Sequence, residues 1–231
     1  MGRYGEQISE LPLYALLTSK ARGKRGQTAD VGKLSGLVLE IADLAGPLLA
    51  NIPVTFKQYT THDIGHAANL IDLMARFIPK KTQQTMSAVE VAVLMLSALL
   101  HDLGMYVTEE EKTQYLESER FRSFLAASPD KEHAIAEAAA AGKRGTVRAI
   151  EDAALADYFR KLHPKRAGEN IDRYLAGKLT WNEIDLAPWV KTICESHGWP
   201  VYESNDPSDP NKAIARALKP SDPLFGVPFH P

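Results

Sequence analysis

Apolar residues recur at helical spacing along most of the chain, whereas alternating strand patterns bounded by turn residues are hard to find. The longest apolar run covers residues 91–100 and follows Ser87 and Glu90, which together form a capping box that begins a helix. Gly104 is placed to end this helix. We therefore expect an all-α protein built around one buried central helix.

Similar apolar stripes predict helices over residues 31–50, 60–77, 147–162 and 186–197, and a polar helix is expected over 108–127. Thr60 or Thr61 is suited to cap the second of them. The helix over 108–127 carries few apolar residues, so we expect it outside the core or over it as a lid. Pro164 is expected to end one helix and begin the next, because proline lacks a backbone N–H.

The length and composition fit one helical domain with a single core. The chain has 231 residues, of which 45% are hydrophobic. We divide it into an N-terminal segment with a basic loop (residues 1–30), a helical domain (31–199) and a tail or connection (200–231). Half of the 14 prolines fall in this last part, which is expected to be irregular around a short helical piece near residues 212–218.

Charge and cysteine content narrow the range of partners. The 27 Lys and Arg against 29 Asp and Glu give no excess positive charge, so nucleic-acid binding is unsupported. Cys194 is the only cysteine, which excludes an intramolecular disulfide and fits a reducing compartment. The first 20 residues lack the apolar core of a secretion signal, and the longest apolar run is about half the length that spans a bilayer. We expect a cytoplasmic protein without a membrane segment.

The adjacent pair His101 and Asp102, at the end of the longest apolar run, is the strongest sign of chemistry. Burying two ionisable side chains is costly unless a bound cation offsets their desolvation. Imidazole nitrogen and carboxylate oxygen suit transition metals. His66 lies on the expected helix 60–77, four residues after His62 and on the same face. For His62 a proton-donating role, a supporting role and an ordinary polar position all stay open.

Two more histidines stand at expected helix ends. His163 precedes Pro164, and His197 continues the inward apolar face of its helix. Both are candidate metal ligands, although the helix dipole alone also favours histidine at a C-terminus. His133, in a charged segment, and His230, near the chain end, are expected to be solvated.

The order of these residues resembles the HD-domain metal-dependent phosphohydrolase superfamily, which is named for its His-Asp doublet. Residues 56–66 (FKQYTTHDIGH) and 98–105 (ALLHDLGM) resemble the HD-CE branch more narrowly, as do 160–163 (RKLH) and 193–198 (ICESHG). That branch is often found at the N-terminus of longer bacterial proteins that carry an Hsp90-like ATPase module. The resemblance covers about residues 50–200 and implies an HD-type helical bundle.

The resemblance also implies a site. Its metal ligands would be His66, His101, Asp102, His163 and His197. They would hold one or two divalent ions of manganese, iron, nickel, cobalt, zinc or magnesium. Asp102 would bridge the ions or orient water, and His62 is the other candidate catalytic residue. The basic residues near His163 that could receive a substrate phosphate, or simply be solvated, are Arg160, Lys161, Lys165 and Arg166.

The expected function is a metal-dependent phosphohydrolase that acts on a nucleotide or other phosphoester through a metal-activated water. A second hypothesis is a non-catalytic metal- or nucleotide-binding regulatory domain coupled to an ATPase module or partner protein. A third is oxygen chemistry at a di-iron centre. The expected partners are accordingly a small phosphoester or nucleotide, an Hsp90-like ATPase module or partner chain, and a second copy of this chain.

One departure from the superfamily concerns a further Asp that closes its site on a late helix. Asp206, Asp209 and Asp222 lie in the proline-rich tail and are interpreted as turn residues. We therefore expect the bundle to lack its final helices, and the chain to be a piece or a shortened version of a longer protein. The helix that ends at His197 would then present an apolar patch suited to dimerisation.

Overall fold

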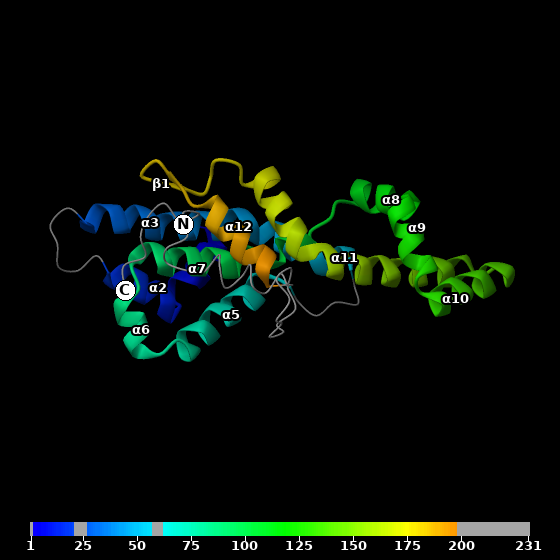
Figure 1. Cartoon of the computed structure of the whole chain (residues 1–231), viewed down its shortest axis with the longest axis horizontal. Helices are drawn as coiled ribbons and strands as arrows, with labels where there is room; N and C mark the ends of the chain where they lie inside the picture. Colours follow the sequence, from blue (N-terminus) through cyan, green and yellow to red (C-terminus); the bar gives the residue numbers. More distant parts are fainter. Residues whose placement is uncertain (1, 21–26, 57–61, 198–231) are drawn as a thin grey trace, which may run out of the picture.

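The computed structural model describes residues 2–20, 27–56 and 62–197, and this part of the chain is almost entirely helical (Figure 1). The helices are α1 (Arg3–Ser9), α2 (Pro12–Ser19), α3 (Gln27–Ala50), α4 (Ile52–Thr55), α5 (Ile64–Phe77), α6 (Lys80–Thr85), α7 (Ala88–Leu100), the 3-10 helix η1 (His101–Met105), α8 (Glu109–Glu117), α9 (Glu119–Ala126), α10 (Pro129–Ala140), α11 (Arg144–Tyr174) and α12 (Ala187–Ser196). Two short strands, β1 (Thr180–Trp181) and β2 (Ile184–Asp185), form an antiparallel hairpin. The prediction of an all-α protein is confirmed.

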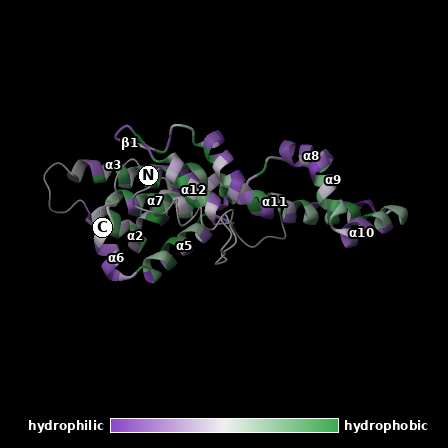
Figure 2. Ribbon diagram, viewed as in Figure 1, coloured by the Kyte–Doolittle hydropathy of each residue, from purple (hydrophilic) through white to green (hydrophobic). Residues whose placement is uncertain are grey.

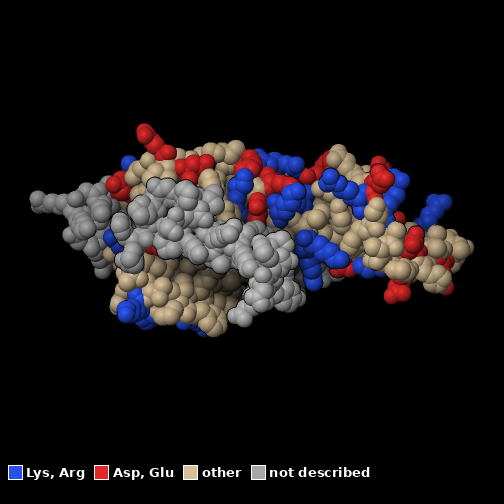
Figure 3. All heavy atoms as spheres, in the orientation of Figure 1, with Lys and Arg blue, Asp and Glu red and all other residues tan. Residues whose placement is uncertain are grey.

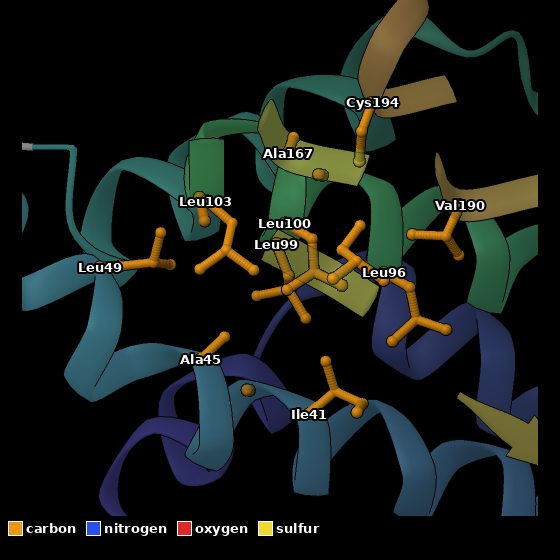
Figure 4. Packing of buried hydrophobic residues seen from close by; sticks show 14 of the residues in the cluster. Ile41, Ala45, Leu49, Leu96, Leu99, Leu100, Leu103, Ala167, Val190 and Cys194 are labelled. Carbon is orange, nitrogen blue, oxygen red and sulfur yellow. The ribbon is translucent and has the colours of Figure 1, made fainter. Parts of the chain in front are cut away.

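Helix α7 is the centre of the core. It is apolar on every side and packs against α2, α3, α5 and α12, which is how such a helix is kept from water. Figure 4 shows Leu96, Leu99 and Leu100 of α7 among apolar side chains of α3 and α12. The helix begins as the sequence predicts, because Ser87 and Glu90 form a complete capping box.

The first two helices belong to the same core, although no apolar stripe predicted them. Ile8, Leu13 and Leu17 are fully buried. Asp43 of α3 holds the start of α1, because its carboxylate accepts hydrogen bonds from the backbone N–H groups of Gly2 and Gly5, the latter at 2.8 Å.

Helices α8, α9 and α10 and the first half of α11 extend away from the rest of the bundle (Figure 1). Figure 2 shows that α8 is mostly hydrophilic, which agrees with the expectation that this region lies outside the core. The single expected helix over 108–127 is divided at Ser118, whose hydroxyl accepts the N–H of Phe121 and caps α9. An ion pair between the buried Lys112 Nζ and the half-buried Asp152 Oδ1, at 2.9 Å, joins α8 to α11.

The predicted helix end at Pro164 is wrong, because α11 continues through this residue from Arg144 to Tyr174. The packing of η1 against α11 favours the unbroken helix. Asn170, beyond the proline, donates through Nδ2 to the carbonyls of Leu103 at 2.8 Å and Tyr106 at 3.2 Å.

The predicted start of the helix over 60–77 is also wrong. Helix α5 begins at Ile64 and is capped by Asp63, whose Oδ1 accepts the N–H of His66 at 3.1 Å. Thr60 and Thr61 lie outside the described residues. His62 therefore precedes the helix and does not share a helical face with His66.

The β1–β2 hairpin is a further difference from the sequence-based expectation. Asn182 and Glu183 connect its strands with φ angles of 45° and 66°. Trp181 docks the hairpin on α3 by donating from Nε1 to the carbonyl of Asp30 at 2.8 Å. Strands of two residues are too short to show a period-two pattern.

Two helical segments, Asp30–Thr55 and Ala88–Met105, are long and apolar enough to cross a membrane by length and composition. The second is longer than the apolar run in the sequence suggested, and 72% of it is buried inside the protein. Core helices pass the same test, so the feature alone does not indicate a membrane span. On the face in Figure 3, acidic and basic side chains are intermixed, in keeping with the near-neutral net charge.

Candidate metal centre

The fold gathers five histidines from four different elements around Asp102. His62 and His66 flank the start of α5, His101 begins η1, His163 lies on α11 and His197 follows α12. Their rings form a continuous series of contacts, with centroid separations of 5.4 Å for 62 to 66, 5.6 Å for 66 to 101, 5.3 Å for 101 to 197 and 4.7 Å for 197 to 163. The predicted residues thus come together, while metal ligation itself stays a prediction.

Asp102 lies between two groups of histidines. Its Oδ2 atom is 2.9 Å from His62 Nδ1, 3.0 Å from His101 Nε2 and 3.4 Å from His66 Nε2. Its Oδ1 atom is 3.7 Å from His163 Nε2. The two oxygens of one carboxylate therefore face different sets of nitrogen atoms.

These contacts define two sets of ligand atoms, each lying within 4.8 Å of one another. One set is His62, His66 and Asp102, and the other is Asp102, His163 and His197. Each could hold a metal ion, with Asp102 shared between them. His101 adds its Nε2 beside the first set.

The doublet is positioned by the end of α7 and by the packing of η1. His101 and Asp102 are not the last residues of the α-helix, as the sequence suggested, but lie on the 3-10 turn that follows it. Gly104 of this turn contacts the backbone of α11 so closely that a Cβ atom would come 2.6 Å from the nitrogen of Ala167. This close contact brings Asp102 to His163.

Three of the histidines use the same hydrogen bond to set their ring orientation. The Nδ1 atom of His101 lies 2.9 Å from the carbonyl oxygen of Ala98, and that of His163 lies 2.6 Å from the carbonyl of Arg160. His197 makes the same contact with Cys194. A carbonyl oxygen can only accept, so each Nδ1 carries a hydrogen. In the neutral rings of His163 and His197, Nε2 then presents a lone pair to the centre, whereas His101 Nε2 donates to Asp102 at 3.0 Å until it loses its proton. Metal-ligating histidines in proteins are commonly held in this way.

The Nε2 atoms of His163 and His197 lie 2.7 Å apart. With both Nδ1 atoms protonated, the two neutral rings bring lone pairs together, and no hydrogen atom is available to join them. A shared cation would satisfy both. Adjacent ligands with bonds of about 2.1 Å lie about 3.0 Å apart at an octahedral ion and about 3.4 Å apart at a tetrahedral one, so the two rings would move apart by a few tenths of an ångström to share an ion.

Burial favours the neutral, metal-binding form of three histidines. It lowers the pKa of His66, His163 and His197 below the ordinary value, despite the opposing influence of Asp102. Burial also disfavours the charged form of Asp102, but hydrogen bonds from His101 and His62 outweigh it and hold the pKa of this carboxyl well below its usual range. Asp102 is therefore an anion at neutral pH.

The candidate substrate-binding residues lie in different surroundings. Arg166 is buried, and its guanidinium donates to the Gly104 carbonyl at 3.0 Å, the Tyr106 carbonyl at 3.1 Å and the Tyr115 hydroxyl at 3.0 Å. It supports η1 from within the protein. The prediction that Arg166 meets substrate is not retained, because its donors are engaged by the protein.

The other three basic residues are exposed on α11. Lys161 places its ammonium 5.0 Å from the ring centroid of Phe124, and Lys165 lies 4.0 Å from Glu169. Arg160 holds His163 through its backbone carbonyl. Their predicted role in phosphate binding is not tested by these contacts.

Sequence reasoning missed two supporting residues, Asp63 and Asn170. Asp63 fixes the first turn of α5, and Asn170 fixes the backbone that follows the doublet. For Asn170 a signal existed: it lies four positions after Arg166, on the same face of the helix. His133, by contrast, is exposed on α10 as expected, and His230 lies outside the described residues.

An all-α bundle with a His-Asp doublet amid further histidines is the arrangement of an HD domain. The model of the HD-CE family matches residues 56–222, and the chain belongs to this family. Comparisons with curated proteins and with solved structures gave no match. The family match extends beyond residue 200 and includes Asp206, Asp209 and Asp222, which lie outside the described residues.

Proposed function

We propose that the chain is a metal-dependent phosphohydrolase that acts on a nucleotide or another phosphoester. The observation that carries the proposal is the position of Asp102, whose Oδ2 faces His62, His66 and His101 while its Oδ1 faces His163. A carboxylate placed in this way can serve two divalent ions at once. Membership of the HD-CE family supports the same assignment.

The charge of the centre favours an anionic substrate. Among the described residues, the two candidate metal sets contain one carboxylate, and their other members are histidines. Two divalent ions would therefore leave an excess of positive charge that one aspartate cannot neutralise. Phosphate oxygens supply the missing negative charge and suit hard divalent cations.

We assign a separate role in the reaction to each group of residues. When bound, a divalent cation polarises a phosphoryl oxygen and makes water a better nucleophile. Asp102 would hold the ions, since its two oxygens face different sets of histidines. His62 contacts Asp102 through Nδ1, and we assign it the transfer of a proton to or from the reacting phosphoester. Arg160, Lys161 and Lys165 are the remaining candidates for binding the distal part of the substrate.

The test combines metal loading with a substrate screen. The protein is loaded separately with manganese, iron, nickel, cobalt, zinc and magnesium, and inorganic phosphate release is measured from a panel of nucleotides and phosphoesters. We expect metal-dependent release that Asp102→Asn reduces by at least 100-fold. His133→Ala is the matched control and should keep full activity. Metal binding without turnover of any substrate would refute the enzymatic assignment.

The second candidate is a regulatory domain that binds metal or nucleotide and signals occupancy to an ATPase module or another partner. The single carboxylate in the two sets favours it, because fewer anionic ligands bind a divalent ion less tightly. Nucleotide binding without hydrolysis would support this function. Oxygen consumption by the iron-loaded protein, with visible absorption, would instead support di-iron chemistry. We place either activity in the cytoplasm.

The predicted apolar patch on α12 is wrong, because Trp189, Val190 and Cys194 are buried and the helix packs against α7 and α11. A further Asp ligand from outside the described residues, or from a second copy of the chain, stays part of the proposal. Comparing metal affinity and solution mass of residues 1–231 with those of any longer natural form tests this, since tight binding by a monomer of 1–231 would show that no further ligand is needed.

A further inference from the structure

His163 differs from the two other histidines that bond a carbonyl three residues earlier. His101 and His197 directly follow the ends of α7 and α12. The last four carbonyl groups of a helix have no partner within it, so the carbonyls of Ala98 and Cys194 are available to these rings. A helix end thus provides the acceptor that orients each ring.

His163 has no helix end nearby. It lies well inside α11, which continues to Tyr174. In an uninterrupted α-helix the carbonyl of Arg160 would accept the N–H of residue 164. Residue 164 is proline, which has no N–H to donate. The carbonyl of Arg160 instead lies 2.6 Å from His163 Nδ1.

We propose that Pro164 is a positioning residue for the metal centre. By withholding one backbone N–H, it leaves the Arg160 carbonyl to the ring of His163 and so keeps the hydrogen of that ring on Nδ1. The Nε2 lone pair is then directed at His197, 2.7 Å away, and towards Asp102. The importance of this arrangement for metal binding rests on the proposed function, whereas the effect on the ring itself does not.

The position of the proline supports a specific role. Proline is the least favourable residue in a helix interior, yet here it directly follows a residue of the centre. Substituting alanine should therefore leave the helix intact and hold or raise the melting temperature. If Pro164 served only the fold, its replacement would lower the melting temperature. If it positions His163, its replacement changes the ring of His163 without lowering the melting temperature.

The experiment compares Pro164→Ala with Pro47→Ala. Pro47 is also a proline inside a helix, but it is exposed on α3 and is not part of the centre. Long-range proton–nitrogen NMR of the metal-free proteins reports which ring nitrogen of His163 carries the hydrogen. Titration with Mn²⁺ and Co²⁺ reports affinity at the set formed by Asp102, His163 and His197.

In the wild-type protein we expect His163 to be protonated at Nδ1. In Pro164→Ala the new backbone N–H competes for the Arg160 carbonyl, so the Nε2-protonated form should appear and affinity at that set should fall about 10-fold or more. Pro47→Ala should change neither quantity. Should Pro164→Ala fail to fold, the wild-type spectrum still decides, because protonation at Nε2 there would overturn the proposal.

An unchanged tautomer in folded Pro164→Ala would also overturn it, whether or not affinity falls, because the proline would then act through the path of the helix alone. A different result would refute the proposed function. If the wild-type protein binds no metal, the proposed metal-dependent function is wrong, but the comparison of tautomers still tests the role of Pro164.

Discussion

Gly104 of η1 lies directly against the backbone carbonyl of His163 on α11. A Cβ atom at Gly104 would overlap this oxygen and come 2.6 Å from the nitrogen of Ala167. The segment that carries the His-Asp doublet and the helix that carries His163 therefore meet without a side chain between them. Only glycine permits this approach, and it brings Asp102 Oδ1 to 3.7 Å from His163 Nε2.

Gly104→Ala should separate these two elements. The added methyl group meets backbone atoms, which cannot rotate away, so we expect a loss of about 1–3 kcal/mol in the free energy of unfolding, together with weaker metal binding. Urea denaturation measures the first effect. Gly36→Ala is the control: its Cβ would meet nothing within 4 Å on α3, and it should gain about 0.5–1 kcal/mol. Equal stability of the two variants would contradict the close-contact account.

We predict that Arg166 contributes mainly to the free energy of unfolding and less to substrate binding. Arg166→Ala leaves the carbonyls of Gly104 and Tyr106 without this donor and should cost about 2–4 kcal/mol in the free energy of unfolding. Lys165→Ala, at an exposed neighbouring position, should stay within about 0.5 kcal/mol of wild type. Thermal unfolding of both variants makes the comparison. A fully stable Arg166→Ala protein with weakened phosphate binding would restore the original substrate-binding prediction.

Metal affinity should rise with pH above 6.5. Burial lowers the pKa of His101, but its hydrogen bond with Asp102 and the charge of that carboxylate outweigh burial and raise the pKa above the ordinary 6.5. A proton on His101 must therefore leave before its Nε2 can bind a metal, and the apparent affinity should increase up to about 10-fold per pH unit through that range. Mn²⁺ titrations between pH 5.5 and 8.5 measure this. A flat profile above pH 6.5 would argue against His101 as a ligand.

The two sets of ligands should be separable by mutation. His66→Ala removes a nitrogen from the set on the Oδ2 side of Asp102, and His197→Ala removes one from the other set. Each variant should lose about one ion per chain, whereas Asp102→Ala and His101→Ala should lower bound metal far more than His133→Ala. Elemental analysis after dialysis counts the ions. Loss of all metal in both His66→Ala and His197→Ala would indicate a single site.

The sequence predicts the central helix and the doublet because their signals are local. The capping box of Ser87 and Glu90 and the continuous apolar run define α7, and a buried His-Asp pair is unusual without a cation. Pro164 misled the prediction of α11, since the local preference of proline to end helices is overridden by tertiary packing around it. That packing joins residues about 60 positions apart, including Arg166 to Gly104 at a separation of 62, and no local pattern records it.

In the candidate site too, local sequence signals predict some features and long-range packing determines the others. Residue type and spacing single out His66, His101 and His197, but only the folded chain places the carboxylate of Asp102 between two sets of nitrogen atoms. The ring orientations depend on backbone carbonyls, which are present at every position and leave no trace in the sequence. The ring orientations of His101, His163 and His197 therefore follow from where their helices end or are interrupted.

Anomalous diffraction from crystals of the manganese-loaded protein tests the central claim most directly. The account predicts two anomalous peaks, one on each side of the Asp102 carboxylate, with bonds of about 2.0–2.2 Å to its oxygens and to the Nε2 atoms of the surrounding histidines. No peak at Asp102 in crystals grown with saturating manganese would contradict the assignment of a metal centre.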